Sequence, residues 1–371
     1  MSALREVALF LPSLDGGGAE GVFVELANEF AARDLRVDLV LAFARGPYTG
    51  DVSPRVRIID FKSARVLGAL PKLVRYLRLE RPAALLSGLD HANVVAVLAR
   101  QIARSDTRCV ISMRAVPSAI YRLDGSGGSR MLLRFMKVAY RFADAIIANS
   151  SAVALDMSKL LRIPIDDVHV IHNPLNLPRI EQQSRAPIPH EWFANGAPPI
   201  VLGVGRLDPL KDFATLIRAF AIVRSRRACR LVILGEGPER SKLESLVRQA
   251  GIADDALMPG FEPNPFAWMR QASVFVSSSL TEGCPNALMQ ALSLGTRVVG
   301  TDCVGGTAEL LEHGRWGTIV PVGFPGAMAA AIGDSLDAGA NPDARLRAAD
   351  FSHERIAQRF LDVLLPEGIR A

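Results

Sequence analysis

Several protein classes are excluded by what this sequence lacks. Its four cysteines in 371 residues have neither the paired spacing of a zinc site nor the density of a disulfide-rich secreted domain. No apolar run approaches the ~18 residues that span a membrane, and no small-residue cleavage site follows the short apolar stretch in MSALREVALFLP. Internal repeats and low-complexity tracts are also absent. We therefore expect a cytoplasmic protein with free thiols at Cys109, Cys229, Cys284 and Cys303.

The composition is typical of a globular α/β protein. Apolar residues make up 49% of the chain and charged residues 22%, and the length suits two domains of ordinary size. The net charge of +5 is uneven, because residues 1–180 hold 24 Lys and Arg against 17 Asp and Glu, whereas the remainder holds 19 against 21. The positive excess in the first half indicates an anionic partner there.

Short runs rich in Val, Ile and Leu alternate with amphipathic helical stretches in two series, which is typical of parallel sheets with crossover helices. The strands are expected near 6–12, 37–43, 83–88, 108–113, 144–148 and 168–172, and again near 198–205, 231–237, 256–261, 273–279 and 296–302. The pattern predicts two Rossmann-like domains over 1–180 and 199–351, a Pro-rich polar linker over 181–198, and a helix over 352–371 that can return to the first domain. Ligands of such sheets bind beyond the carboxyl ends of the strands.

The first loop, SLDGGGAEGVF, contains the G-x-G-x-x-G spacing of a dinucleotide site. A nicotinamide site also needs an acidic residue at the end of the second strand, but Asp38 lies at its start, and Arg45 beyond its end could face only a 2′-phosphate. Two other interpretations remain open. The loop is either a flexible turn that opens a helix over 19–33, or a set of bare N–H groups that attracts an anion such as a diphosphate.

The stretch GVGRLDPLKDFATLIRAF at 203–220 leaves a strand and enters a helix after Pro209. This pattern predicts Arg206 at the carboxyl end of the strand and Lys211 in the first turn of the helix. A cation at a helix start opposes the helix dipole, so a bound anion would explain it. The alternative is that both cations are ordinary solvated charges.

The stretch SSSLTEGCPNALMQALSLG at 277–295 ends a strand in serines and starts a helix near residue 286, with Pro285 at the first helical position. The N–H groups of the first helical residues would be free to bind hydroxyls or a phosphate. Glu282, just before them, can accept hydrogen bonds from hydroxyls. This turn is the most informative part of the chain.

Together these stretches resemble retaining glycosyltransferases of family 4 over nearly the whole chain. The resemblance is carried by DGGGAEGVFVELANEFAARDLRVDLV at 15–40, IANSSAVALDM at 147–157, VIHNP at 170–174, GVGRLDPLKDFATLIRAF, LVILGEGP at 231–238 and EGCPNALMQALSLG. It implies the GT-B architecture, in which two doubly wound Rossmann-like domains face a central cleft. It also implies transfer of a sugar from a nucleoside diphosphate sugar, so a nicotinamide cofactor is not expected.

The resemblance assigns roles to the matching residues. The implied donor-site residues are Arg206 and Lys211 at the diphosphate, Gly17 and Gly18 approaching it from the first domain, Glu282 at the sugar hydroxyls, and Gly260 and Phe261 at the base. The other donor-binding residues are Gly283, Asn286, Ala287 and Leu288, whose N–H groups can meet sugar hydroxyls or a phosphate. Arg206, Lys211, Glu282 and His91 are the expected catalytic residues. On the acceptor side it implies His91 near the reacting carbon and, on weaker grounds, Arg114. A lone histidine such as His91 is also common as a structural residue, and His172 belongs to the VIHNP turn.

One position departs from the family pattern, which places a second glutamate eight residues after the first, at the nucleotide ribose. Here that position is Gln290. Glutamine keeps an acceptor oxygen and adds a donor, but it loses the charge that favours two ribose hydroxyls at once. The departure puts donor affinity in question and leaves the fold unaffected.

No D-x-D pattern occurs, so the Asp-bound metal of another transferase architecture is not expected. Positioned cations stabilise a leaving diphosphate without a metal, and Arg206 and Lys211 would take that role. Neither a cofactor nor a metal site is therefore expected.

The segment 129–144 places Arg130, Arg134, Lys137 and Arg141 at spacings of four, three and four, which is one basic stripe along a helix. Apolar residues flank the stripe, so the helix either lies on an anionic membrane surface or packs on the core with a solvated basic face. The basic helix expected at 71–81 favours a peripheral membrane protein.

The function expected from these observations is metal-independent, retaining transfer of a hexose from a nucleoside diphosphate sugar to a hydroxyl acceptor, a lipid-linked or cell-surface glycan precursor. No nucleic-acid partner is expected. Two alternatives stay open: a sugar-nucleotide binding protein without turnover, suggested by Gln290, and a sugar-nucleotide epimerase on the same fold.

Overall fold

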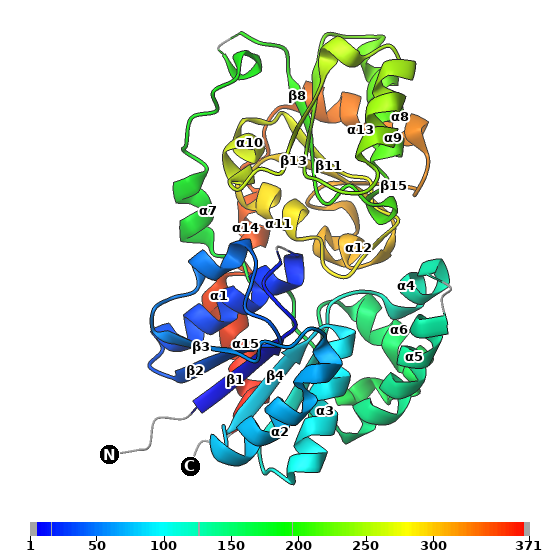
Figure 1. Ribbon diagram of the computed structural model, residues 1–371. Coiled ribbons are helices and arrows are strands. Elements are labelled where there is room, and N and C mark those ends of the chain that lie inside the picture. The colour runs from blue at the N-terminus through cyan, green and yellow to red at the C-terminus, as the bar shows by residue number, and fades with distance from the viewer. Residues whose placement is uncertain (1–5, 16, 125–126, 195, 367–371) are drawn as a thin grey trace. The chain divides into compact units, whose positions relative to one another are not determined.

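The structure, a computed structural model, describes residues 6–15, 17–124, 127–194 and 196–366 and divides into two α/β units (Figure 1). Unit 1 holds the described residues up to Pro174 together with those from His353 onward, and unit 2 is Leu175–Ser352. The sequence therefore predicted the fold class correctly.

Unit 1 is built on a seven-stranded parallel sheet with the order β3-β2-β1-β4-β5-β6-β7. The strands are β1 (Glu6–Leu11), β2 (Arg36–Leu41), β3 (Val56–Asp60), β4 (Ala84–Gly88), β5 (Arg108–Met113), β6 (Ala145–Ala148) and β7 (Val168–Val170). The strand order reverses between β1 and β4, so the loops after these two strands diverge and leave room for a ligand between them.

Helices cover both faces of this sheet because its strands are apolar on both sides. One face packs against α2 (Leu70–Leu79), α3 (Asp90–Ala103), α5 (Gly127–Ala139) and α6 (Ser151–Leu161), and the other against α1 (Gly18–Ala32) and α15 (His353–Leu364). The helix α4 (Pro117–Asp124) and the 3-10 turns η1 (Pro47–Asp51), η2 (Val66–Ala69), η3 (Tyr140–Phe142) and η4 (Ile165–Asp167) complete the unit.

The last helix, α15, belongs to unit 1 although unit 2 separates it from the rest of that unit in the sequence. Phe360 and Leu364 are fully buried in the same apolar cluster as α1. Arg33, at the end of α1, donates to the Glu354 carbonyl at 2.6 Å and to Gln358 Oε1 at 2.8 Å. The core of unit 1 is therefore completed by residues from the far end of the chain.

Unit 2 contains a six-stranded parallel sheet with the order β10-β9-β8-β11-β13-β15 and a small parallel pair, β12 with β14. The strands are β8 (Ile200–Val204), β9 (Arg230–Leu234), β10 (Ala256–Gly260), β11 (Val274–Ser277), β12 (Thr281–Glu282), β13 (Arg297–Thr301), β14 (Val304–Gly305) and β15 (Thr318–Val320). The helices are α7 (Leu177–Gln183), α8 (Phe213–Arg224), α9 (Arg240–Gln249), α10 (Pro265–Gln271), α11 (Asn286–Ser293), α12 (Thr307–Leu310), α13 (Pro325–Ala338) and α14 (Ala344–Ala349). The 3-10 turns are η5 (Glu191–Phe193), η6 (Pro209–Lys211), η7 (Ala253–Asp255) and η8 (Glu312–Gly314).

The segment expected as a linker, 181–198, contains ordered structure that packs on unit 2. The helix α7 reaches into it from Leu177, capped by Asn176, whose side chain accepts from the Arg179 N–H at 3.1 Å. In η5 the Phe193 ring meets Trp268 edge-on, with the ring centroids 5.0 Å apart. A seven-residue helix is too short to show a hydrophobic period, which is why the sequence pattern missed it.

A charge network, in which only Asp38 is buried, occupies the amino end of the unit 1 sheet. The described residues contain one group of three carboxylates close enough to share a cation, Glu6, Asp38 and Glu80. Arg57 donates to all three, to Asp38 at 2.5 and 2.7 Å, so its guanidinium lies between them and offsets part of their negative charge. Burial and the neighbouring Asp38 raise the pKa of Glu6 to about 7. Asp38 also accepts from the Tyr76 hydroxyl, so it is a structural carboxylate, not a ribose ligand.

The four cysteines are buried free thiols, as expected. Burial raises the pKa of Cys109 to about 12, which makes its thiol unreactive at neutral pH. Among the described residues no helix has both the length and the apolar character needed to cross a bilayer.

Candidate functional site

The loop after β8 carries the two cations of the predicted diphosphate site. The chain leaves β8 at Val204, forms η6 over Pro209–Lys211, and enters α8 at Phe213. Asp212 caps that helix with a left-handed backbone (φ 42°) and accepts from the Thr215 N–H. Lys211 therefore precedes the helix, and the expectation that it lies in the first helical turn was wrong. The sequence pattern did not distinguish the 3-10 turn η6, which starts at Pro209, from the first turn of α8.

Lys211 is paired with the glutamate of the second predicted motif. Its Nζ lies 2.5 Å from Oε1 of Glu282, and the Ser279 hydroxyl donates to the same oxygen at 2.7 Å. The Lys211 side chain is 30% exposed and that of Glu282 11%. Because β8 and β11 are neighbours in the sheet, the loops at their carboxyl ends meet there. The structure thus brings together two residues that the sequence places 71 positions apart.

Arg206 lies in the same loop but differs from Lys211 in its surroundings. Its side chain is exposed, and no hydrogen bond or ion pair joins it to any other residue that the structure describes. The Coulomb attraction of Arg206 is therefore available to a ligand, whereas that of Lys211 is shared with a carboxylate.

The backbone of Glu282 is held by a glycine that the sequence analysis did not single out. Glu282 pairs with Gly305 in the small sheet of β12 and β14, and its carbonyl accepts from the Gly306 N–H at 3.2 Å. Gly305 has φ 143°, and a Cβ there would overlap the Glu282 carbonyl oxygen. The Gly-Gly pair a few residues after the strand expected near 296–302, in TDCVGG, was the available signal for this close approach.

The helix α11 begins at Asn286, with Pro285 as its cap and Gly283 buried in the turn before it. The predicted start was therefore correct to within one residue. Leu288 is fully buried in the core of unit 2, so only its N–H could reach a ligand. Asn286, Ala287 and Gln290 are half-buried.

Gln290 lies one turn beyond the first residues of α11. Its backbone carbonyl accepts from the Ser293 hydroxyl, and its side chain bonds to nothing within the described parts of the chain. This amide is therefore available to a ligand.

In unit 2, glycines allow the backbones of neighbouring loops to approach one another closely. Gly235 has φ 140° and donates to the carbonyl of Gly260 at 2.7 Å, and a Cβ on Gly235 would overlap the Gly205 carbonyl. Gly260 also has a positive φ, 105°. Phe261, directly after it, is 59% exposed. The predicted base-contacting pair therefore sits at the carboxyl edge of the sheet, with the aromatic ring accessible.

In unit 1 the glycine loop ends in the long helix α1. Gly17 is its cap, in extended backbone, and both Gly17 and Gly18 are exposed after the carboxyl end of β1. Gly16 lies outside the described residues. An exposed helix N-terminus suits an anion, but the role of these glycines at a diphosphate stays a prediction.

His91 lies in the first turn of α3, after the carboxyl end of β4, and is exposed. The turn before it is strained, because Leu89 has φ 74°. The preceding Asp90, which the sequence analysis did not select, accepts from the Tyr121 hydroxyl at 2.8 Å, and burial raises its pKa. An acidic residue next to His91 at a helix start was the available signal.

Arg114 follows β5 and is anchored to the VIHNP turn. Its Nη2 donates to Asn173 Oδ1 at 2.6 Å, and its carbonyl accepts from Asn149 at 3.0 Å. These bonds hold the guanidinium at the same carboxyl edge of the sheet as His91. Its acceptor-side role stays a prediction.

Comparisons with known proteins identify the family. The family model described as "Glycosyltransferase Family 4" matches residues 16–179. A second family model, described as "Glycosyl transferases group 1", matches residues 198–338. A curated relative from Campylobacter jejuni, an N-acetylgalactosaminyltransferase, is 30% identical over 282 residues, which cover 75% of this chain and 74% of the relative. The chain belongs to glycosyltransferase family 4. The resemblance inferred from its motifs is confirmed, and the protein is a transferase of sugars.

Further similarities extend along almost the whole chain. The lipopolysaccharide core biosynthesis glycosyltransferase LpsE of Rhizobium meliloti is 25% identical and covers 93% of this glycosyltransferase and 92% of its own length. The crystal structure of Anabaena HepE in complex with UDP superposes with a TM-score of 0.79, at 21% identity, over 97% of this chain and 99% of that chain. This structural neighbour shows the GT-B fold.

The Gly305 contact yields a test of how Glu282 is held. Gly305→Ala should lower Tm by roughly 5 °C or more, because the new methyl group must push the Glu282 backbone away in addition to straining φ. The same variant should reduce transferase activity, measured in parallel with thermal unfolding.

Gly314→Ala is the matched control, since Gly314 also has a positive φ, 108°, but faces open space. Gly314→Ala should lower Tm by less than Gly305→Ala, because it strains only the backbone φ, and it should keep its activity. Equal effects of the two substitutions would mean that the overlap with Glu282 is unimportant.

Proposed function

We propose that this glycosyltransferase moves a hexose from a nucleoside diphosphate sugar, with retention of configuration, onto a hydroxyl of a lipid-linked or cell-surface glycan precursor. The observation that carries the proposal is the Lys211–Glu282 pair with the unpaired Arg206 in the same loop of unit 2. A cation suits the diphosphate of such a donor, and a neighbouring carboxylate suits the hydroxyls of the sugar next to it.

The two cations would divide the work at the diphosphate. The Lys211 ammonium has three donors and uses one for Glu282, so it can bind a phosphate oxygen while the carboxylate accepts from a sugar hydroxyl. Arg206 adds a second positive charge, which stabilises the nucleoside diphosphate as it leaves. This assignment needs no metal ion.

Two relatives support the substrate classes. Anabaena HepE has been crystallised with UDP and with UDP-glucose, which supports a nucleoside diphosphate sugar as donor. The Campylobacter jejuni relative is named for action on a saccharide linked to diphospho-undecaprenol, which supports a lipid-linked acceptor here. Release of UDP or GDP only when acceptor is present would distinguish the transferase from a binding protein and from an epimerase.

The first prediction concerns Arg206. Arg206→Ala should weaken binding of UDP or GDP but leave binding of the parent nucleoside unchanged, and should lower turnover roughly a hundredfold, the scale of losing one charge-stabilising donor. Thermal-shift titration with diphosphate and nucleoside separates the two contributions. Addition of a chelator should leave the wild type unchanged.

Arg218→Ala supplies the control, since Arg218 is an exposed arginine of α8 with no side-chain partner among the residues described. If Arg206→Ala and Lys211→Ala combined leave diphosphate binding intact in a folded protein, the diphosphate site is elsewhere.

The second prediction concerns Gln290, which we place at the nucleotide ribose. A neutral acceptor bonds hydroxyls more weakly than a carboxylate, by about 1 kcal/mol per bond. Gln290→Glu should therefore lower the donor KM severalfold and change kcat little, because the ribose is held alike in ground and transition states.

Gln271→Glu, at an exposed position of α10, makes the same charge change away from the site and should have no effect. Loss of activity in a folded Gln290→Glu protein would show that the ribose assignment is wrong. Activity that appears only in the Glu variant would favour a binding protein without turnover.

We further propose that α5 and η3 dock unit 1 on an anionic membrane surface. Arg130, Arg134 and Arg141 are exposed and Lys137 is half-buried. Beside this basic stripe runs an apolar one, also exposed: Met131 at 51%, Phe135 at 54%, Val138 at 62% and Phe142 at 53%. The opposite side of the helix, through Met136 and Ala139, fills the core, so exposed apolar side chains are not needed for folding.

A variant with Glu at the four basic positions should lose binding to vesicles that contain phosphatidylglycerol, because each charge near such a surface contributes about 1 kcal/mol. Co-sedimentation with these vesicles and with pure phosphatidylcholine measures the difference. Equal binding to both lipids, or no loss in the folded variant, would contradict membrane docking.

A further inference from the structure

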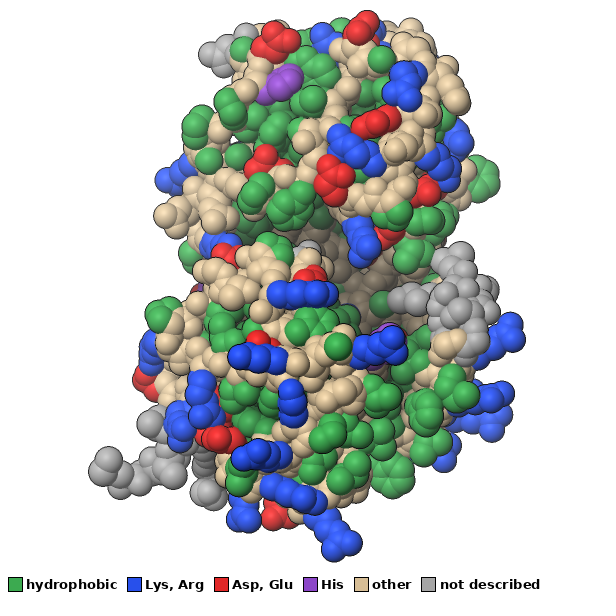
Figure 2. Space-filling model, viewed as in Figure 1, with side chains coloured by type: hydrophobic (Ala, Val, Ile, Leu, Met, Phe, Trp, Pro, Cys, Tyr) green, Lys and Arg blue, Asp and Glu red, His purple; other side chains and the backbone are tan. Residues whose placement is uncertain are grey.

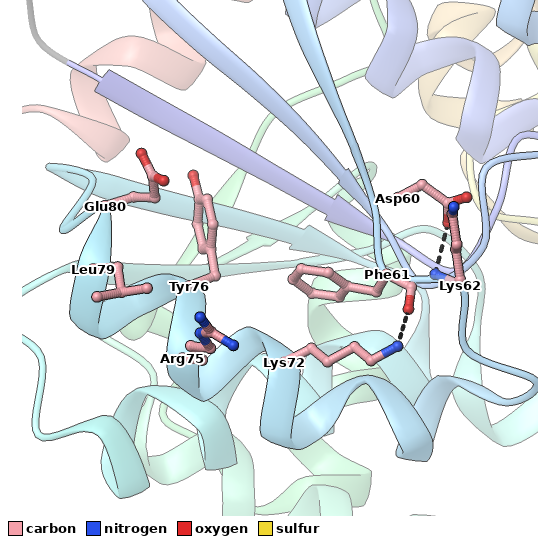
Figure 3. Close-up of a pocket in the computed structure, with 8 residues that line it drawn as sticks. All are labelled: Asp60, Phe61, Lys62, Lys72, Arg75, Tyr76, Leu79 and Glu80. Atoms are coloured by element: carbon pink, nitrogen blue, oxygen red, sulfur yellow. Dashed lines mark hydrogen bonds between the residues drawn. The ribbon is translucent and has the colours of Figure 1, made fainter.

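Unit 1 has a pocket that none of the donor or acceptor assignments uses. It lies between the carboxyl end of β3 and the helix α2 and has a volume of about 330 Å³ (Figure 3). Its lining consists of Asp60, Phe61, Lys62, Lys72, Arg75, Tyr76, Leu79 and Glu80. This volume is at the lower end of the range for small-molecule sites.

The walls of the pocket combine an aromatic floor with apolar and cationic edges. Phe61 and Tyr76 meet edge-on with ring centroids 6.5 Å apart, and both are nearly buried. Leu79, at the far end of α2, is 68% exposed. A single exposed aliphatic residue is common on protein surfaces, so Leu79 contributes an apolar edge to the pocket and does not by itself indicate a ligand.

The charges of the pocket favour an anion. Both carboxylates are already engaged, Glu80 by Arg57 and Asp60 by the N–H groups of Ala44 and Lys62. The side chains of Lys62 and Arg75 have no hydrogen-bond or ion-pair partner in the described parts of the chain, and Lys72 bonds only to the Phe61 carbonyl. Three cations thus face two carboxylates, one of which, Glu80, is shared with Arg57 outside the lining, so the pocket keeps a net positive charge.

The pocket and the basic and apolar stripes of α5 belong to the same helical layer of unit 1. The helices α2 and α5 both pack on α3, in the layer that covers one face of the sheet. Figure 2 shows Lys and Arg side chains over this part of unit 1, in the view of Figure 1. Ile102, at the end of α3, is a further exposed apolar residue in this layer, at 50%. Its carbonyl accepts from Arg78 of α2.

We infer that this pocket binds the phosphate head group of an anionic bilayer lipid, so that α2 is a second membrane contact beside α5. The inference rests on the membrane docking proposed for α5 and names its partner more closely. The phosphate lies among Lys62, Lys72 and Arg75, and the apolar part of the lipid lies along Leu79. A surface with two such contacts fixes the orientation of unit 1 on the bilayer, which a single helix does not.

The double substitution Lys62→Gln, Arg75→Gln tests the pocket, because it removes two unpaired charges and no described hydrogen bond of their side chains. Its binding to vesicles containing phosphatidylglycerol should be roughly thirtyfold weaker than that of the wild type, the combined effect of two charges near an anionic surface. Thermal unfolding and UDP or GDP binding should be unchanged. A failure here is therefore distinct from a failure of the transferase proposal.

The matched control is Arg218→Gln, Arg226→Gln, which removes two exposed, unpaired arginines of unit 2 and should leave vesicle binding unchanged. Equal losses in the two double variants, or no loss in the pocket variant, would overturn the inference. A second arm compares thermal stabilisation by a short-chain phosphatidic acid with that by inorganic phosphate. Stabilisation by the lipid alone, abolished in the pocket variant, supports the inference, and equal stabilisation by free phosphate overturns it.

Discussion

The organisation of the loop after β8 in unit 2 depends on the ion pair between Lys211 and Glu282. The two side chains come from loops after neighbouring strands, and the pair, at 2.5 Å, is largely shielded from water on its acidic side. Backbone bonds reinforce it, since the Leu280 N–H donates to the Leu210 carbonyl and the Ser278 hydroxyl to the Lys211 carbonyl. A partly buried pair with additional hydrogen bonds holds its geometry better than an exposed one. The neighbouring Arg206 can then remain without a partner while the loop itself stays ordered.

The sequence predicted the α/β class and most of the strands because parallel strands buried on both faces appear as continuous apolar runs. It missed β3, in which Arg57 and Ile58 are exposed, and β15, which has only three residues. Both are edge strands, and the exposure of β3 and the shortness of β15 weaken the apolar signal that marks the central strands. The other two edge strands, β7 and β10, were predicted. The small pair β12–β14 was also missed, because two residues per strand carry no period.

For the site, the sequence predicted residues but not their contacts. Motif spacing indicated Arg206, Lys211 and Glu282, but it could not show that Lys211 is already paired or that Arg206 is not, since pairing depends on how two distant loops meet. Leu288 illustrates the opposite limit. It belongs to a motif that is predicted to bind the donor, yet its side chain fills the core. At a helix N-terminus the backbone groups are open to a ligand, whereas the side chains point to both surface and interior.

The position of α15 has a consequence for biosynthesis. The cluster around α1 is completed by Phe360 and Leu364, and Arg108 of β5 donates to the Val363 carbonyl at 2.9 Å. During translation these residues emerge only after all of unit 2. Unit 2 is continuous and can fold as it leaves the ribosome, while one face of the unit 1 sheet stays partly uncovered until the end. The nascent chain therefore exposes this apolar surface of unit 1 until unit 2 has been synthesised. Unit 1, which is the first to begin synthesis, is the last to complete its fold.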